Sequence, residues 1–247
     1  MASWMVHLRI ADNLLNLIEG LEPVYFAIGN VATDSGIPDE NWENFDPPPE
    51  LLHFQKSNAD LWHLADLDFY RQHLLPYKGK FIEPDRFAFL LGYFFHLVID
   101  NLWRENIDNP TRKRFASEFE ADKDFIWQVK RDWYGLDFEY VRSQPDSIFW
   151  RIFVDCEYAK DYLEFLPREA VQLRLEYIKE LYQRTDEKIE EWYVNRPKLY
   201  LNKKEMDDFI DVTTAILQRI YKILWVDGVE ISNLSSSLEL IRFNENI

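Results

Sequence analysis

The segment that most constrains the fold is 87–104, with the sequence FAFLLGYFFHLVIDNLWR. A helix that is apolar nearly all round is buried among other helices, so this segment predicts the centre of a helical bundle. His96 and Asp100 interrupt it, and because they are four residues apart they lie on one helix face. Burying either group without a partner costs several kcal/mol. Two interpretations are open: the pair is hydrogen-bonded to itself and to neighbouring polar groups, or it binds a metal ion.

Apolar residues recur at helical spacing along most of the chain. They predict helices at 6–19, 59–75, 84–106, 111–134, 168–193 and 204–225, and a short one after residue 228. The 247 residues contain no long strand pattern, internal repeat or low-complexity linker. We therefore predict an all-α fold, a single-domain helical bundle over residues 1–247.

Composition excludes several classes of protein. Only seven glycines are present, with no GxGxxG or GxxxxGK[ST] motif, which argues against Rossmann and P-loop folds. The net charge of −16 weighs against nucleic acid as a partner and matches an anionic membrane poorly. The single cysteine, Cys156, excludes an intrachain disulfide and predicts a small buried side chain. Because no signal-peptide pattern and no apolar run of roughly 18 residues occurs, we expect a cytoplasmic protein without a transmembrane segment.

The segment 23–57 differs in character from its surroundings. It holds five prolines and two glycines, so we predict that it is mainly irregular with short helical turns. Long irregular segments in compact domains are usually functional. This one is rich in possible oxygen ligands and ends in a histidine: Asp34, Asp39, Glu40, Asp46 and His53.

Four short pieces then fall in a recognisable order: VHLRIA at 6–11, GNVATD at 29–34, HF at 53–54 and LGYFFHLVID at 91–100. This order resembles the zinc-dependent phospholipase C family, whose relatives include the P1/S1-type nucleases and the N-terminal domain of a glycosylphosphatidylinositol-specific phospholipase D. The resemblance covers about residues 4–105, and residues 106–247 form a helical remainder. It implies a helical bundle with a metal site at its mouth.

The resemblance also implies a set of ligands. Asp34, His53, His96 and Asp100 would form one zinc site, and Asp100 would bridge to a second ion that His7 also binds. Imidazoles and carboxylates are the non-thiolate ligands that zinc prefers. Asp34 resembles the carboxylate proposed to double as general base. The implied activity is hydrolysis of a phosphodiester or phospholipid-like substrate through attack by a metal-bound hydroxide.

The chain departs from the family pattern in two places. The family's first tryptophan binds metal through its amino group, whereas Trp4 here follows three other residues. The histidines of the third zinc ion are missing, because no histidine follows His96. Glu118 and Asp122 have the i, i+4 spacing to replace them as a carboxylate site. We therefore expect one or two zinc ions, with a third site in doubt.

Three functions remain open from the sequence. The first is a zinc-dependent phosphoric diester hydrolase, and the second is a non-catalytic metal-binding or scaffold protein that kept the fold and lost the third ion site. The third is a metal-free helical protein in which His96 and Asp100 are hydrogen-bonded in the core. Aromatic residues near the expected mouth either contact substrate or belong to the core: Tyr25, Phe26, Trp42, Phe45, Phe54 and Tyr93.

Overall fold

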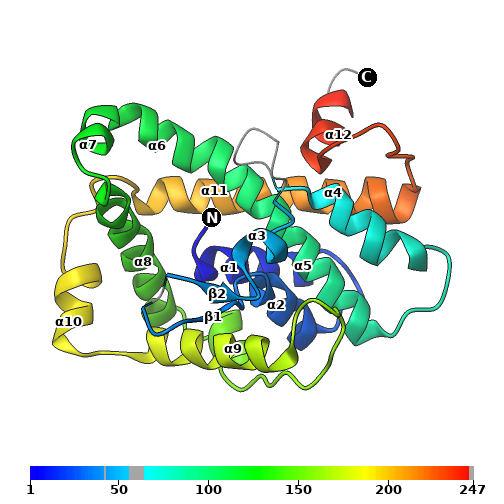
Figure 1. Cartoon of the computed structure of the whole chain (residues 1–247), viewed down its shortest axis with the longest axis horizontal. Coiled ribbons are helices and arrows are strands. Elements are labelled where there is room, and N and C mark those ends of the chain that lie inside the picture. The colour runs from blue at the N-terminus through cyan, green and yellow to red at the C-terminus, as the bar shows by residue number, and fades with distance from the viewer. Residues whose placement is uncertain (42, 56–63, 245–247) are drawn as a thin grey trace.

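The computed structural model describes residues 1–41, 43–55 and 64–244, with side chains up to residue 241. In this part of the chain, helices make up almost all of the regular structure, and one pair of two-residue strands completes it (Figure 1). The prediction of an all-α fold is confirmed at this level, while the more specific phospholipase C-type architecture stays a prediction.

The helices and strands follow one another along the chain as α1 (Trp4–Leu15), α2 (Pro23–Ala32), β1 (Ile37–Pro38), β2 (Phe45–Asp46), α3 (Pro49–Leu52), α4 (Asp66–Phe69), α5 (Pro84–Trp103), α6 (Asn109–Arg114), α7 (Ala116–Ala121), α8 (Phe125–Ser143), α9 (Arg168–Gln183), α10 (Glu187–Ile189), α11 (Lys203–Tyr221) and α12 (Ser237–Asn244). Turns of π-helix extend several of these helices or stand alone. They lie at Tyr70–Leu74, Arg104–Asp108, Phe149–Phe153, Glu190–Val194 and Lys222–Asp227.

Helix α5 lies at the centre of the molecule and runs on into α6 as one long diagonal rod (Figure 1). Every residue of α5 from Ala88 to Trp103 is buried, as its apolar sequence predicts. Helix α2 packs along α5, and α1 packs against α2 and α11. The buried helices of the first hundred residues thus meet at one place, next to the polar pair of α5.

Two glycines let α2 and α5 approach closely. A Cβ atom on Gly29 would lie 2.2 Å from the carbonyl oxygen of Phe89, and one on Gly92 would lie 2.5 Å from that of Phe26. Both neighbours are backbone atoms, so neither contact can be relieved by turning a side chain. The glycines therefore set the distance between the two helices that carry the candidate site.

The segment between α2 and α3 folds back on itself through β1 and β2. These strands pair antiparallel, with Ile37 opposite Asp46 and Pro38 opposite Phe45. The short helix α3 follows directly, so the loop after α2 and the end of α3 lie near each other (Figure 1). This fold-back brings two of the predicted ligands together.

The C-terminal segment is tied to the region around α4. The buried Asp66 carboxylate accepts hydrogen bonds from the backbone N–H and hydroxyl of Ser237, at the start of α12. Arg71 donates to the carbonyl oxygens of Ile231 and Leu234 at 2.7 and 2.5 Å. Asp66 therefore acts structurally, by holding the start of the last helix.

Some helix predictions are confirmed and others are wrong. Helices predicted at 84–106 and 204–225 correspond to α5 and α11 with their extensions, and α12 supplies the short helix after residue 228. The segment 23–57 is not mainly irregular at its start, because Pro23 occupies the first turn of α2 and the Glu22 carboxylate caps it through the Tyr25 N–H. The start of the helix predicted at 59–75 falls outside the described residues.

The two helices predicted at 111–134 and 168–193 are interrupted. Phe115 leaves the helical conformation between α6 and α7, and the Asp122 carboxylate accepts from the Asp124 N–H in a turn before α8. Helix α8 then continues through Gly135, where a Cβ atom would come within 2.4 Å of the Tyr193 carbonyl oxygen. After α9 the chain leaves the helix, and α10 begins behind Asp186, whose carboxylate caps it by accepting a hydrogen bond from the Ile189 N–H.

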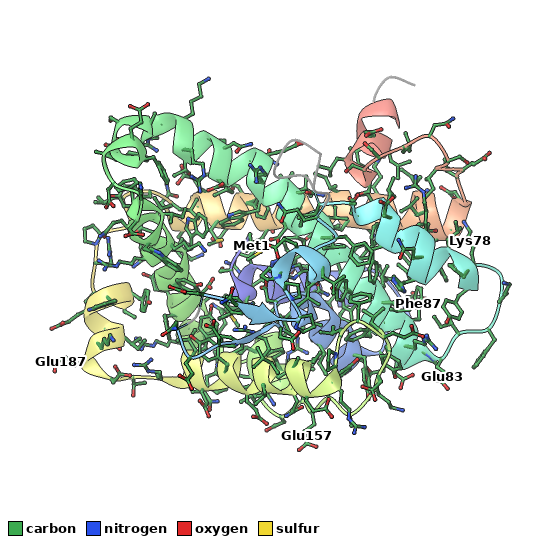
Figure 2. All side chains as sticks on the ribbon, in the orientation of Figure 1. Met1, Lys78, Glu83, Phe87, Glu157 and Glu187 are labelled. Carbon is green, nitrogen blue, oxygen red and sulfur yellow. The ribbon has the colours of Figure 1, made fainter. Side chains whose placement is uncertain are left out.

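Side chains fill the spaces between the helices, and Met1 lies beside α1 in the middle of the view, whereas Glu83, Glu157 and Glu187 lie at the periphery (Figure 2).

Cys156 is buried with a free thiol, as the sequence predicts. No helix among the described residues combines the length and the apolar composition needed to cross a lipid bilayer.

Candidate metal centre

Five side chains from separate parts of the first hundred residues converge on one place. His7 comes from α1, Asp34 follows α2, His53 ends α3, and His96 and Asp100 lie one turn apart on α5. All are buried except Asp34, which is partly buried. They form two overlapping groups, one of His7, His96 and Asp100 and one of Asp34, His53 and His96; within each, one ligand atom per residue lies within 4.8 Å of the others. Buried groups of this kind could hold a metal ion.

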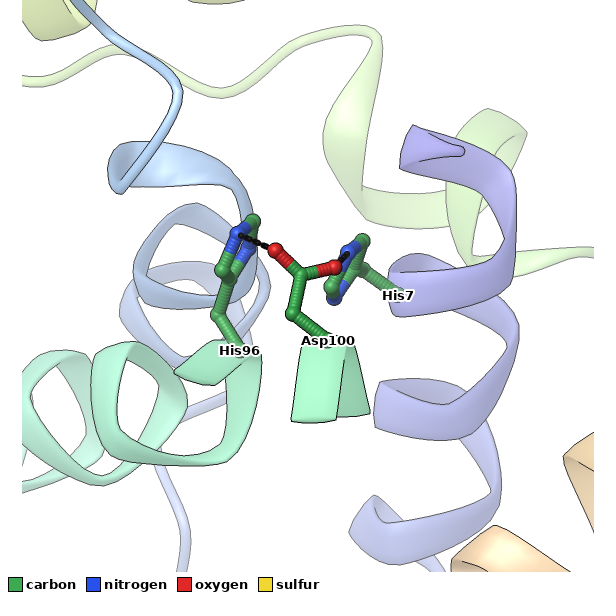
Figure 3. A group of neighbouring side chains, drawn as sticks. All are labelled: His7, His96 and Asp100. Atoms are coloured by element: carbon green, nitrogen blue, oxygen red, sulfur yellow. Dashed lines mark ion pairs between the residues drawn. The ribbon is translucent and has the colours of Figure 1, made fainter. Parts of the chain in front are cut away.

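The Asp100 carboxylate directs one oxygen to His7 and the other to His96 (Figure 3). Its Oδ1 is 3.4 Å from Nε2 of His7, and its Oδ2 is 3.4 Å from Nε2 of His96 and 3.8 Å from Nε2 of His53. Asp34 Oδ1 is 3.2 Å from Nε2 of His53. The rings of His7 and His96 stack with their centroids 3.9 Å apart and their planes 4° from parallel.

Backbone carbonyls fix the tautomers of two of the histidines. His96 Nδ1 lies 2.8 Å from the Asn30 carbonyl oxygen, and His53 Nδ1 lies 2.9 Å from that of Pro49. A carbonyl oxygen can only accept, so each Nδ1 carries the hydrogen and, in the neutral ring, Nε2 keeps the lone pair. This arrangement, in which the second ring nitrogen donates to a carbonyl, is the usual support of a metal-ligating histidine.

Several polar atoms of the cluster have no hydrogen-bond partner among the described residues. They are both ring nitrogens of His7, Nε2 of His53 and His96, and Oδ2 of Asp100. Each unsatisfied buried polar group costs about 1–3 kcal/mol. Lone pairs that face one another across a dry space need a positive centre between them, so these orphaned atoms fit a bound cation.

The spacing of the donor atoms also fits. Zinc holds nitrogen and oxygen ligands at about 2.0–2.1 Å, so two ligands of a tetrahedral site are about 3.3–3.4 Å apart. The separations from His7 to Asp100, from His96 to Asp100 and from His53 to Asp34 are 3.4, 3.4 and 3.2 Å. They are longer than most hydrogen bonds and match the spacing of two ligands on one ion.

The surroundings keep most of these groups ready to bind metal. Burial, reinforced by the charge of His96, lowers the pKa of His7 to about 4. Burial acts to raise the pKa of Asp34 and Asp100, but contact with His53 outweighs it at Asp34, and the positive amino group at residue 1, with His96 and His7, outweighs it at Asp100. Both carboxyls therefore have a pKa below the usual range. Burial acts to lower the pKa of His96, but Asp100 and Asp34 raise it.

The amino-terminal residues contact the site in a way that the sequence does not reveal. The backbone N–H of Ala2 donates to Asp100 Oδ1 at 2.7 Å, and the indole N–H of Trp4 donates to Asp34 Oδ2 at 2.8 Å. The side chain of Trp4 thus orients one of the expected ligands. Trp4 begins α1, and its contact with Asp34 follows from the packing of α1 against α2, which no sequence motif indicates.

The carboxylates expected to replace the missing third site lie elsewhere. Glu118 is on α7 and Asp122 follows it, and both are exposed. Glu118 accepts a hydrogen bond from the Ser117 hydroxyl. Neither belongs to the two ligand groups found among the described residues.

A cavity of about 430 Å³ opens over Asp34 and His53, and eight of its lining residues are tryptophan, tyrosine or phenylalanine. Of the aromatic residues expected near the mouth, Phe45 lines this cavity, whereas Phe26 and Tyr93 are fully buried in the core. Tyr25 and Phe54 pack against other aromatic rings away from it, and Trp42 lies outside the described residues. Cavity walls from α8 and α9 were not foreseen from the sequence.

Comparison with known proteins adds no relative. No family model matches the chain, and no curated protein or solved structure gives a significant match.

Proposed function

We propose that this protein is a metal-dependent phosphodiester hydrolase of the phospholipase C type, with one or two zinc ions held by His7, Asp34, His53, His96 and Asp100. The observation that carries the proposal is the convergence of these side chains from separate segments. Their facing nitrogen and oxygen atoms are 3.2–3.4 Å apart, and the Nε2 atoms of all three histidines have no hydrogen-bond partner among the described residues. The resemblance of the sequence motifs to the zinc-dependent phospholipase C family supplies the reaction class.

The residues divide into ligands and their supports. When bound, zinc supplies Lewis acidity toward a phosphoryl oxygen and lowers the pKa of a water molecule. Asn30 and Pro49 hold the rings of His96 and His53 through their carbonyl oxygens. Because Asp34 alone among the carboxylates of the cluster lines the cavity, its carboxylate is the base that takes the proton of the attacking water. The Trp4 indole keeps that carboxylate in place.

A second candidate function is a binding or scaffold protein that keeps a metal without turnover. It is favoured by the exposed positions of Glu118 and Asp122, away from the cluster, since loss of one ion removes part of the stabilisation of a phosphoryl transition state. The cytoplasmic location expected from the sequence stays a prediction that cell fractionation would test.

The first test is the metal content of the purified protein, measured by inductively coupled plasma mass spectrometry. We expect one or two zinc ions per chain, and His96→Ala to lose at least one because it belongs to both ligand groups. His73→Ala is the matched control, since His73 lies outside both groups in another cavity. Metal-free wild type, or equal loss in both variants, would remove the basis of the proposal.

The second test separates the two candidate functions by hydrolysis of bis-p-nitrophenyl phosphate. We expect Asp34→Asn to lower kcat by about 10²–10⁴-fold, the usual contribution of a general base. Zinc content should be measured alongside, because Asp34 is also a ligand. Tightly bound zinc with no turnover in the wild type would favour the binding or scaffold protein.

A further inference from the structure

The cavity over Asp34 has a charge opposite to that of the chain. The whole sequence has 44 acidic and 28 basic residues. Among the described side chains that line this cavity, however, Asp34 is the only acid, while Lys130 and Arg174 supply two cations. Aromatic and apolar side chains make up most of the rest of the wall. An acidic protein thus has a positively charged, apolar recess beside a candidate metal centre.

Lys130 is the cation without a carboxylate partner. It lies on α8, partly buried, and its Nζ is 4.9 Å from the centroid of the Trp127 ring. No carboxylate of the described residues lies within ion-pair distance of this ammonium. Lys130 lines the same cavity as Asp34 and His53. Burial lowers its pKa, and the carboxylates of Asp34, Asp108 and Asp100 act in the opposite direction.

Arg174 contributes a second charge deeper in the wall. It lies on α9 with 9% of its surface exposed, and its guanidinium is 5.5 Å from the rings of both Trp4 and Tyr177. Its Nη2 donates to the Gly36 carbonyl oxygen at 3.0 Å, while its Nε is buried without a hydrogen-bond partner among the described residues. A buried, incompletely satisfied guanidinium favours an anionic ligand.

We propose that this cavity binds a monoanionic phosphate diester with an aromatic or apolar substituent, and that Lys130 contacts its phosphoryl oxygens. This inference rests on the proposed function and names the substrate class of the same site. Arg174 is already fixed by Gly36 and the two rings, so it adds positive potential, whereas the Lys130 ammonium is free to donate hydrogen bonds to the phosphate. The substituent packs on the partly exposed aromatic rings of Phe45, Tyr134 and Tyr193 in the cavity wall.

Isothermal titration calorimetry with diphenyl phosphate tests this inference separately from catalysis. We expect Lys130→Met, which keeps the apolar stem, to raise the Kd for diphenyl phosphate at least about tenfold. The Kd for diphenoxymethane, which is uncharged and joins the same two phenoxy groups through a single carbon, should stay unchanged. Lys130→Arg should retain most of the affinity, and Lys130→Gln replaces Lys130→Met if that variant does not fold.

Lys188→Met is the matched control, because the Lys188 ammonium also lies 4.9 Å over a tryptophan ring, that of Trp192, but does not line the cavity. Equal weakening in the Lys188 variant, equal loss for both ligands, or no binding of diphenyl phosphate by the wild type would overturn the inference. Binding that depends on Lys130 without hydrolysis of bis-p-nitrophenyl phosphate would support it and contradict the proposed function. Hydrolysis of bis-p-nitrophenyl phosphate with the same KM in wild type and Lys130→Met would support the proposed function and contradict the role of Lys130.

Discussion

At the scale of single residues, the Asp137 carboxyl makes stability depend on pH. It is buried on α8, and burial raises its pKa to about 7 although the hydroxyls of Ser3 and Tyr182 donate to it at 2.8 and 2.6 Å. Between pH ~4 and ~7 the folded protein keeps a proton that the unfolded chain releases. The free energy of unfolding therefore decreases as the pH rises through this range, by at most about 4 kcal/mol from this group.

Asp137→Asn should remove this contribution, because the amide does not ionise. Urea unfolding of wild type and variant at several pH values between 4.5 and 8 measures the effect. We expect the variant to gain stability relative to the wild type as the pH rises. A difference between the two proteins that is independent of pH would show that Asp137 titrates at its ordinary pKa.

The candidate site could be predicted from the sequence only as far as its ligands are local or ordered along the chain. His96 and Asp100 are one turn apart, so their common helix face follows from spacing alone, and the order of the motifs indicated His7, Asp34 and His53. Lys130 and Arg174 gave no such signal. Their position in the cavity wall depends on α8 and α9 packing over the candidate site, a long-range arrangement that no short motif encodes.

At the scale of helices, the contact between α2 and α5 positions the candidate ligands. Gly29→Ala places a Cβ atom against the Phe89 carbonyl oxygen, so the two helices must move apart. Overpacking of this kind costs about 1–3 kcal/mol. Since Asn30 follows Gly29 and holds His96, we expect both a lower urea midpoint and a lower zinc content.

Gly20→Ala provides the comparison for that experiment. Gly20 follows α1 with a φ of +80°, and no atom would lie within 4 Å of an added Cβ. This variant should lose about 1–2 kcal/mol through backbone strain alone and keep its zinc. If Gly29→Ala lowered the midpoint but left zinc content unchanged, the helix contact would not position the ligands.

The prolines and glycines of the segment 23–57 explain why the sequence does not predict α2. A segment with prolines and glycines is typical of a loop, but here Pro23 starts a helix and Gly29 allows close packing. Helix α5 was predicted almost to the residue because its apolar pattern is a local property. The interruptions at Phe115 and before α8 depend on side-chain hydrogen bonds and backbone turns that helical periodicity does not reveal.

At the scale of the whole molecule, the two halves of the chain share one apolar core. Trp103 at the end of α5 packs edge-on against Trp133 of α8 and Phe209 of α11, with ring centroids 5.1 and 5.0 Å apart. The buried apolar residues pack into a single cluster, whose members come from the whole chain between Ala2 and Ile241. The portion that carries the candidate metal centre, about residues 4–105, therefore buries part of its surface against the remainder.

We accordingly expect the halves to unfold together. Urea unfolding followed by tryptophan fluorescence and by far-ultraviolet circular dichroism should give coincident transitions. Trp103→Ala removes a fully buried ring at the junction and should lower stability by about 3–5 kcal/mol, shifting both transitions equally. Two transitions, of which only one responds to Trp103→Ala, would mean that the chain contains two independent folding units and that the predicted single domain is wrong.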